Sequence, residues 1–226
     1  MSGGEVIDAA ALARLAAWFS PACPVGAFSY SHGLERLCED GALANRQDAE
    51  TAIALALTDG SGRTDAILLA ETWRAQTDGR SVEPLRQLSL ALAPTAERWQ
   101  ESVRQGNAFA AVIDGAWPLG VPLAGRGDLP YPVAVGLAGA GHGVPLRPLV
   151  HGFLMAFAAN LISAAVRLVP LGQTDGQRLT ARLSDLADTL TQEACAADLD
   201  DIGGAALGLD LASMRHECQE VRLYRS

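Results

Sequence analysis

The chain has 226 residues, of which 49% are apolar and 19% charged, so it can form one sizeable hydrophobic core and is expected to be a single domain, residues 1–226. Its 17 basic residues are all arginine and are scattered, and the net charge is −9, which argues against nucleic-acid binding. The lack of lysine also excludes a P-loop and lysine-based covalent catalysis, so any nucleotide hydrolysed nearby would be bound by another protein.

The first predicted helix is capped by Asp8 and ends at Pro21. Its apolar stripe consists of Leu12, Leu15, Trp18 and Phe19. Residues 20–35 contain two prolines, two glycines and two aromatic residues, so this segment is expected to form a shaped loop. The loop leads into a second helix that stops at Gly41.

Capping residues, helix breakers and apolar spacing predict four further helices, over about 45–60, 64–79, 81–92 and 95–113. Asn45 caps the first of them, Thr64 or Asp65 starts the second, and Thr95 starts the fourth. The segment 115–132 is dense in proline and glycine and is expected to be an irregular connection.

A short apolar helix is predicted over residues 133–140. The glycine-rich residues 139–143 do not form a dinucleotide-binding loop, because no strand precedes them. The Arg-Gly-Asp sequence at 126–128 is attributed to chance, since no secretory signal is found.

The most apolar segment runs from Leu149 to Val169 and is long enough to be a transmembrane candidate. Four polar residues interrupt it, namely His151, Asn160, Ser163 and Arg167. A helix that is apolar nearly all round but carries such residues is expected at the centre of a helical domain. Its small residues define one face for close helix packing, namely Gly152, Ala156, Ala159 and Ser163.

Pro170 and Gly172 end this helix, and Thr174 with Gln177 is expected to form a capping box for the next one. That helix runs to about Asp198, with an inward stripe of Leu179, Leu183, Leu186 and Leu190. No convincing strand pair is found, so the predicted fold is all-α, with about eight to ten helices around the central helix at about 148–169.

The C-terminal tail, residues 203–226, follows a flexible acidic segment that starts at Asp198, and it has few large apolar residues. The tail is therefore expected to be mobile in the isolated chain and ordered by a partner.

No catalytic site is evident. Ser29 and His32 lie close in sequence, but a nucleophile and base need a third orienting group, so helix capping is the favoured role of the serines. A hydrolase using this cluster remains an alternative. His142 and His151, like His32, are interpreted as structural.

Metal ligation is only weakly indicated. The residues that could accept nickel are Cys195, Asp198, Asp200, Asp201, His216 and Cys218, but their spacing specifies no site. The four cysteines, which also include Cys23 and Cys38, show no CxxC spacing and favour a reducing cytoplasm. No metal site and no cofactor are therefore assigned, and a stand-alone nickel carrier is kept as a second alternative.

Four stretches together resemble the urease accessory protein family UreF. They are SPACPVGAFSYSHGLE (20–35), YPVAVGLAGAGHGVPL (131–146), ANLISAAVRLVPLGQTDGQ (159–177) and DLDDIGGAALGLDLASMRHECQEVRLYRS (198–226). The resemblance implies an all-helical, cytoplasmic, non-enzymatic nickel-assembly chaperone. Members of this family form homodimers within a larger complex, bind UreD (also called UreH), and recruit the GTPase UreG to apo-urease. GTP hydrolysis is thereby coupled to nickel insertion. Neither a nucleic acid nor a membrane is an expected partner.

The family motifs match at the following positions: Pro24, Gly26, Phe28, Ser29, Tyr30, Gly33, Glu35, Pro170, Gly172, Gln173, Thr174, Gln177, Met214, Arg215, His216, Glu217, Arg222, Leu223, Arg225 and Ser226. Cys218 and Tyr224 depart from the common threonine and phenylalanine, and residues 41–130 match only in helical pattern.

From this resemblance, the loop 20–35 and the tail are predicted to bind partners. The predicted partner-binding residues are Phe28, Ser29, Tyr30, His32, Glu35, Gln173, Asp175, Arg215, Arg222, Tyr224 and Arg225. Tyr30 is expected on the surface and Phe28 partly packed.

Overall fold

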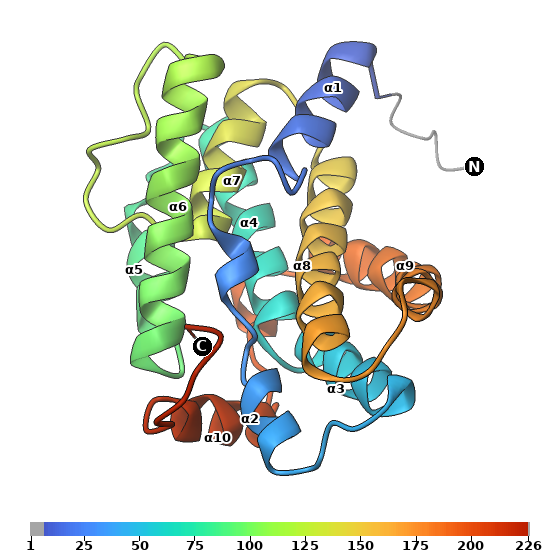
Figure 1. Ribbon diagram of the computed structural model, residues 1–226. Coiled ribbons are helices and arrows are strands. Elements are labelled where there is room, and N and C mark those ends of the chain that lie inside the picture. The colour runs from blue at the N-terminus through green and yellow to red at the C-terminus, as the bar shows by residue number, and fades with distance from the viewer. Residues whose placement is uncertain (1–6, 226) are drawn as a thin grey trace.

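The computed structural model describes residues 7–225 and is all-helical over them (Figure 1). Its α-helices are α1 (Ala9–Trp18), α2 (Leu34–Glu39), α3 (Arg46–Thr58), α4 (Ser61–Thr77), α5 (Glu83–Ala91), α6 (Ala96–Ala116), α7 (Tyr131–Gly141), α8 (Leu146–Leu168), α9 (Gln173–Ala196) and α10 (Leu207–His216). Two 3₁₀ turns, η1 (Ala27–Ser29) and η2 (Leu199–Asp201), complete the described elements. The predicted all-α class is confirmed.

Local capping explains several of the helix starts. The Asp8 carboxylate accepts a hydrogen bond from the Ala11 amide at 2.6 Å. Asn45 accepts from the Gln47 amide at 2.8 Å, and Thr95 caps α6. Side-chain oxygens in these positions satisfy amides that have no partner within the helix, so each start is fixed by its own sequence.

Two predicted helix starts are wrong. Helix α4 begins at Ser61, one turn before Thr64 or Asp65, and Gly60 is its N-cap. Helix α9 begins at Gln173, which places Thr174 inside the first turn, and Gly172 is the cap. The capping box predicted from Thr174 is therefore not formed, and the Gly172 carbonyl accepts from the first-turn amides instead.

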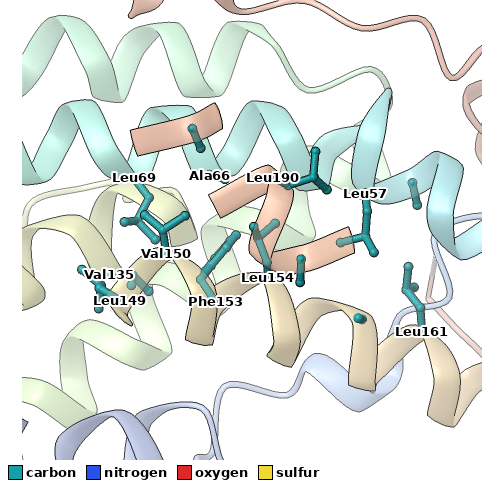
Figure 2. Close-up of a cluster of buried hydrophobic side chains, with 14 of the residues drawn as sticks. Leu57, Ala66, Leu69, Val135, Leu149, Val150, Phe153, Leu154, Leu161 and Leu190 are labelled. Carbon is teal, nitrogen blue, oxygen red and sulfur yellow. The ribbon is translucent and has the colours of Figure 1, made fainter. Parts of the chain in front are cut away.

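Helix α8 contributes many buried side chains to the hydrophobic core (Figure 2). It contacts α2, α3, α4 and α9. In the close-up, Leu149, Phe153 and Leu154 from α8 lie among Leu69 and Leu190 of other helices. Burying such large apolar side chains is the main favourable term in folding.

By length and composition α8 could also cross a membrane, the single such helix within residues 7–225. Its packing is that of a core helix: half of its most apolar stretch is buried among the neighbouring helices.

The small-residue face of α8 is only partly a packing face. A Cβ atom added at Gly152 would lie 2.7 Å from the Phe19 ring, so glycine permits close contact with the segment after α1. Ala159, in contrast, is exposed, and the prediction of tight packing there is wrong. Leu12 is also exposed rather than inward-facing, because α1 is buried mainly through Trp18.

Candidate functional site

The loop 20–35 approaches α10 closely through two adjacent left-handed residues. His32 has φ of 53° and Gly33 has φ of 81°. A Cβ atom at Gly33 would lie 3.0 Å from the Ser213 amide nitrogen of α10, so only glycine fits both the backbone conformation and the contact. Figure 1 shows α10 beside α2, close to the end of the chain.

The two aromatic rings of this loop lie opposite to expectation. Phe28 is 65% exposed, whereas Tyr30 is only 4% exposed. The 3₁₀ turn η1 presents Phe28 to solvent, and the extended backbone of Tyr30 then turns its ring inward. The Tyr30 carbonyl accepts a hydrogen bond from the side-chain Nδ2 of Asn160 in α8 at 3.3 Å. The predicted surface position of Tyr30 is wrong, as is the partial packing of Phe28.

His216, near the end of α10, lies between two carboxylates and is fully buried. Its Nε2 atom is 3.0 Å from Glu35 Oε2, and its Nδ1 atom is 2.8 Å from Glu97 Oε2. Glu35 belongs to α2 and Glu97 to the first turn of α6. We call these three side chains the buried carboxylate–imidazole network; it joins elements separated by more than 100 residues in the sequence.

The end of the tail docks onto this network. The Leu223 amide donates to Glu35 Oε1 at 2.7 Å, and the Tyr224 amide donates to Glu35 Oε2 at 3.0 Å. The Arg225 amide donates to the Ser29 carbonyl at 2.8 Å, and the Arg222 guanidinium donates to Glu97 at 2.6 Å.

The structure thus shows the tail packed on the domain, whereas the sequence predicts a mobile tail in the isolated chain. The tail carries the helix α10 and the buried Tyr224 side chain. Burial raises the pKa of the Tyr224 phenol, and the Arg167 guanidinium partly opposes this shift. The small number of large apolar residues in the tail does not predict this docked state, because the tail is held by polar contacts to the carboxylates of Glu35 and Glu97.

Several apolar side chains on the same part of the molecule remain exposed. Leu207, Leu211 and Met214 recur at helical spacing on the outer face of α10. Val221 and Leu223 are 80% and 78% exposed. Clusters of exposed apolar residues mark interaction sites more often than isolated ones do. We define the docking surface as Phe28, the outer face of α10, and residues 221–225.

The other predicted partner-binding residues divide into two groups. Arg215 and Arg225 are exposed and lie on or beside the docking surface, and Ser29 is partly exposed. Gln173 and Asp175 lie at the start of α9, where Asp175 pairs with Arg178 at 3.0 Å. Figure 1 shows α9 on the opposite side of α8 from α10, so the structure does not bring these two residues to the docking surface.

His32 belongs to a second buried polar cluster, between the loop, α4 and α6. The Arg98 guanidinium donates to His32 Nε2 at 2.7 Å and to Glu101, while Gln105 donates to Glu101 at 2.8 Å. Burial lowers the pKa of His32, and the nearby Arg98 charge adds to this effect. A neutral ring that accepts from Arg98 fits this environment.

The two carboxylates of this cluster have opposite pKa shifts. Burial raises the pKa of Glu101, but the Arg98 charge and the hydrogen bonds outweigh it, and the pKa falls to about 2. At Asp65, burial raises the pKa to about 7 although Arg98 partly opposes the shift. The cluster thus holds a charged Arg98–Glu101 pair next to a carboxyl that readily takes up a proton.

This cluster does not have the geometry of a hydrolase. Within residues 7–225, no hydrogen bond joins Ser29 to a histidine, and the polar atoms described near His32 Nε2 belong to Glu101 and Arg98. A nucleophile needs its base within hydrogen-bonding reach. The remaining two histidines contact other parts of the fold: His142 bonds the Trp117 carbonyl, and His151 contacts the Thr191 hydroxyl.

The weak nickel candidates are not brought together either. No group of three histidine, cysteine or acidic residues suited to a metal occurs in the described part of the chain. Both ring nitrogens of His216 face carboxylates, and Asp198 and Asp201 cap the backbone of η2. Cys195 is partly buried, and Cys218 is exposed.

Comparison with known proteins agrees with the resemblance seen in the sequence. The family model UreF matches residues 43–184. The chain is 50% identical over 220 residues to the urease accessory protein UreF of Cereibacter sphaeroides (strain KD131 / KCTC 12085), covering 96% of this chain and 99% of the relative. Identity to the urease accessory protein UreF of Bradyrhizobium sp. (strain ORS 278) is 46% over 224 residues, covering 97% and 93%. The relatives are named accessory proteins, in agreement with the non-enzymatic expectation.

Proposed function

Because this chain belongs to the UreF family of urease accessory proteins, we propose that it is a cytoplasmic nickel-assembly chaperone in urease maturation. In this proposal it bridges UreD/UreH and the GTPase UreG to apo-urease and couples GTP hydrolysis to nickel insertion. It acts as a homodimer within that larger complex. The single observation that carries the proposal is the docking surface, where the loop 20–35 and the tail meet.

The composition of the docking surface supports a protein partner. Interfaces concentrate binding energy in a few large apolar, aromatic and arginine side chains. Phe28, Val221 and Leu223 supply exposed apolar area, and Arg215 and Arg225 lie among them as exposed cations. Guanidinium groups bind carboxylates in bidentate pairs. A partner with an apolar groove flanked by acidic residues would fit this surface.

The composition of the chain also indicates that a partner, and not this chain, binds GTP. The chain has no lysine and a net charge of −9, so the phosphate groups of GTP are expected to be bound by the partner GTPase. The scattered nickel candidates make a stand-alone carrier less suitable than a scaffold that positions other subunits.

Substitutions that leave the fold intact test the proposal. Phe28→Asp and Leu223→Asp each place a charge on the docking surface, whereas Val121→Asp alters a residue that is similarly exposed but lies in the loop before α7. We expect the first two variants to lose co-purification with the UreD/UreH and UreG counterparts at least tenfold, and the control to retain it. Normal complexes in both docking-surface variants, with unchanged circular dichroism, would contradict the proposal.

A further inference from the structure

Glu35 is the point at which the tail is attached to the domain. Its two carboxylate oxygens accept from three donors of the tail: His216 Nε2, the Leu223 amide and the Tyr224 amide. We propose that Glu35 and His216 are positioning residues that hold the tail so that its exposed side chains form one surface with Phe28. This inference rests on the function proposed above and assigns what keeps its docking surface in place.

The geometry of the network favours one defined tail position. The His216 ring reaches Glu35 with one nitrogen and Glu97 with the other, so it links two separate helices. Arg222 donates to the second oxygen of Glu97 and balances the charge on that side. Hydrogen bonds to ionised groups are shorter and stronger than neutral ones and depend on direction. Rotation of α10 or slippage of the tail would break several of them together.

Apolar packing alone would not hold the last residues of the tail. Val221 and Leu223 point to solvent, and among residues 221–225 Tyr224 is the one buried side chain. The amides of residues 223 to 225 nevertheless all bond to the loop 20–35 or to Glu35. When the tail leaves, Glu35 loses three donors and becomes accessible to water. We therefore expect these contacts to form and to break together.

Removing one acceptor of this network tests the proposal. Glu35→Gln keeps the side-chain shape but replaces one acceptor oxygen with an NH₂ group, which cannot accept from the tail amides. Glu39→Gln is the matched control, because Glu39 lies one turn later in α2 and is exposed. His216→Asn disrupts the same network from the side of the tail.

Hydrogen exchange measures the position of the tail directly. We expect the amides of Leu223, Tyr224 and Arg225 to exchange at least tenfold faster in Glu35→Gln and His216→Asn than in the wild type and in Glu39→Gln. The amides of α8 should keep their protection. Wild-type exchange rates at the three tail amides in both variants would overturn the proposal, as would loss of α8 protection in both, which would assign these residues to core stability.

Assembly with the UreD/UreH and UreG counterparts separates positioning from direct contact. If Glu35 acts through the tail, Glu35→Gln should weaken assembly about tenfold, and combining it with Leu223→Asp should add little, because both changes remove the same surface. Fully multiplicative effects would mean that Glu35 contacts a partner itself, and would overturn the proposal. If Leu223→Asp and Phe28→Asp abolish assembly while Glu35→Gln leaves both exchange and assembly unchanged, the proposed function stands and the positioning role fails.

Discussion

Asp65 offers a sharp test of the buried polar cluster around Arg98. Its carboxyl lies near the start of α4, beside two cavities lined by His32 and Arg98. Its pKa is raised to about 7. Burial is the main cause, the Arg98 charge partly opposes it, and the Glu101 charge adds to it. An ionised Asp65 is therefore unfavourable in the folded chain, and we predict that Asp65→Asn stabilises it.

The sign and size of the effect follow from proton linkage. An unfolded aspartate has a pKa of about 3.9. Between that value and about 7 the folded chain binds more protons than the unfolded chain, so the Asp65 contribution to stability falls as the pH rises and is constant above about 8. A shift from the ordinary value to about 7 corresponds to about 4 kcal/mol when fully ionised. Because Asp65 retains some solvent exposure, we expect a gain of about 1 to 3 kcal/mol for Asp65→Asn at pH 8.

Urea unfolding at pH 6 and pH 8 measures this contribution. The gain in Asp65→Asn should be smaller at pH 6 than at pH 8, because more of the folded carboxyl is protonated at pH 6. Asp185→Asn, on the exposed face of α9, is the control and should change stability by less than about 0.5 kcal/mol at either pH. Equal or lower stability of Asp65→Asn at pH 8, or a gain that does not grow with pH, would refute the reasoning.

Three other perturbations have defined outcomes. Gly106→Ala should cost at least about 3 kcal/mol in thermal or urea unfolding, because its Cβ atom would lie 1.9 Å from the Leu129 carbonyl oxygen. Gly115→Ala in the same helix meets nothing and should be neutral or stabilising. Equal effects would contradict the close contact between α6 and the segment before α7. In urea unfolding, Tyr30→Ala should lower the free energy of unfolding by about 3 kcal/mol and Phe28→Ala by less than about 0.5 kcal/mol. The reverse order would favour the sequence-based prediction that Tyr30 is exposed and Phe28 is packed. Truncation after Leu211 removes the donors that pair with Glu35, so it should lower the melting temperature and also abolish the complex. An unchanged melting temperature would show that the tail is not docked.

Most of the helical framework could be predicted from the sequence, because its signals are local. Asp8, Asn45 and Thr95 each satisfy amides within a few residues, so their caps depend on little else. The apolar sequence of α8, together with the polar residues that interrupt it, likewise predicts a core helix rather than a membrane span. The family motifs in the loop 20–35 and in the tail predict partner binding from the sequence alone.

Which faces of the loop 20–35, of α8 and of the tail are exposed depends on the tertiary structure. Phe28 and Tyr30 are both aromatic residues of one loop, and only the turn η1 and the neighbouring α8 determine which ring is buried. Ala159 has the right spacing for a packing face, but no helix covers it. The docked tail depends on a contact between Glu35 and His216, which are 181 positions apart. Periodicity and capping rules describe neighbours along the chain, whereas pairing of buried charges depends on how the helices meet in space.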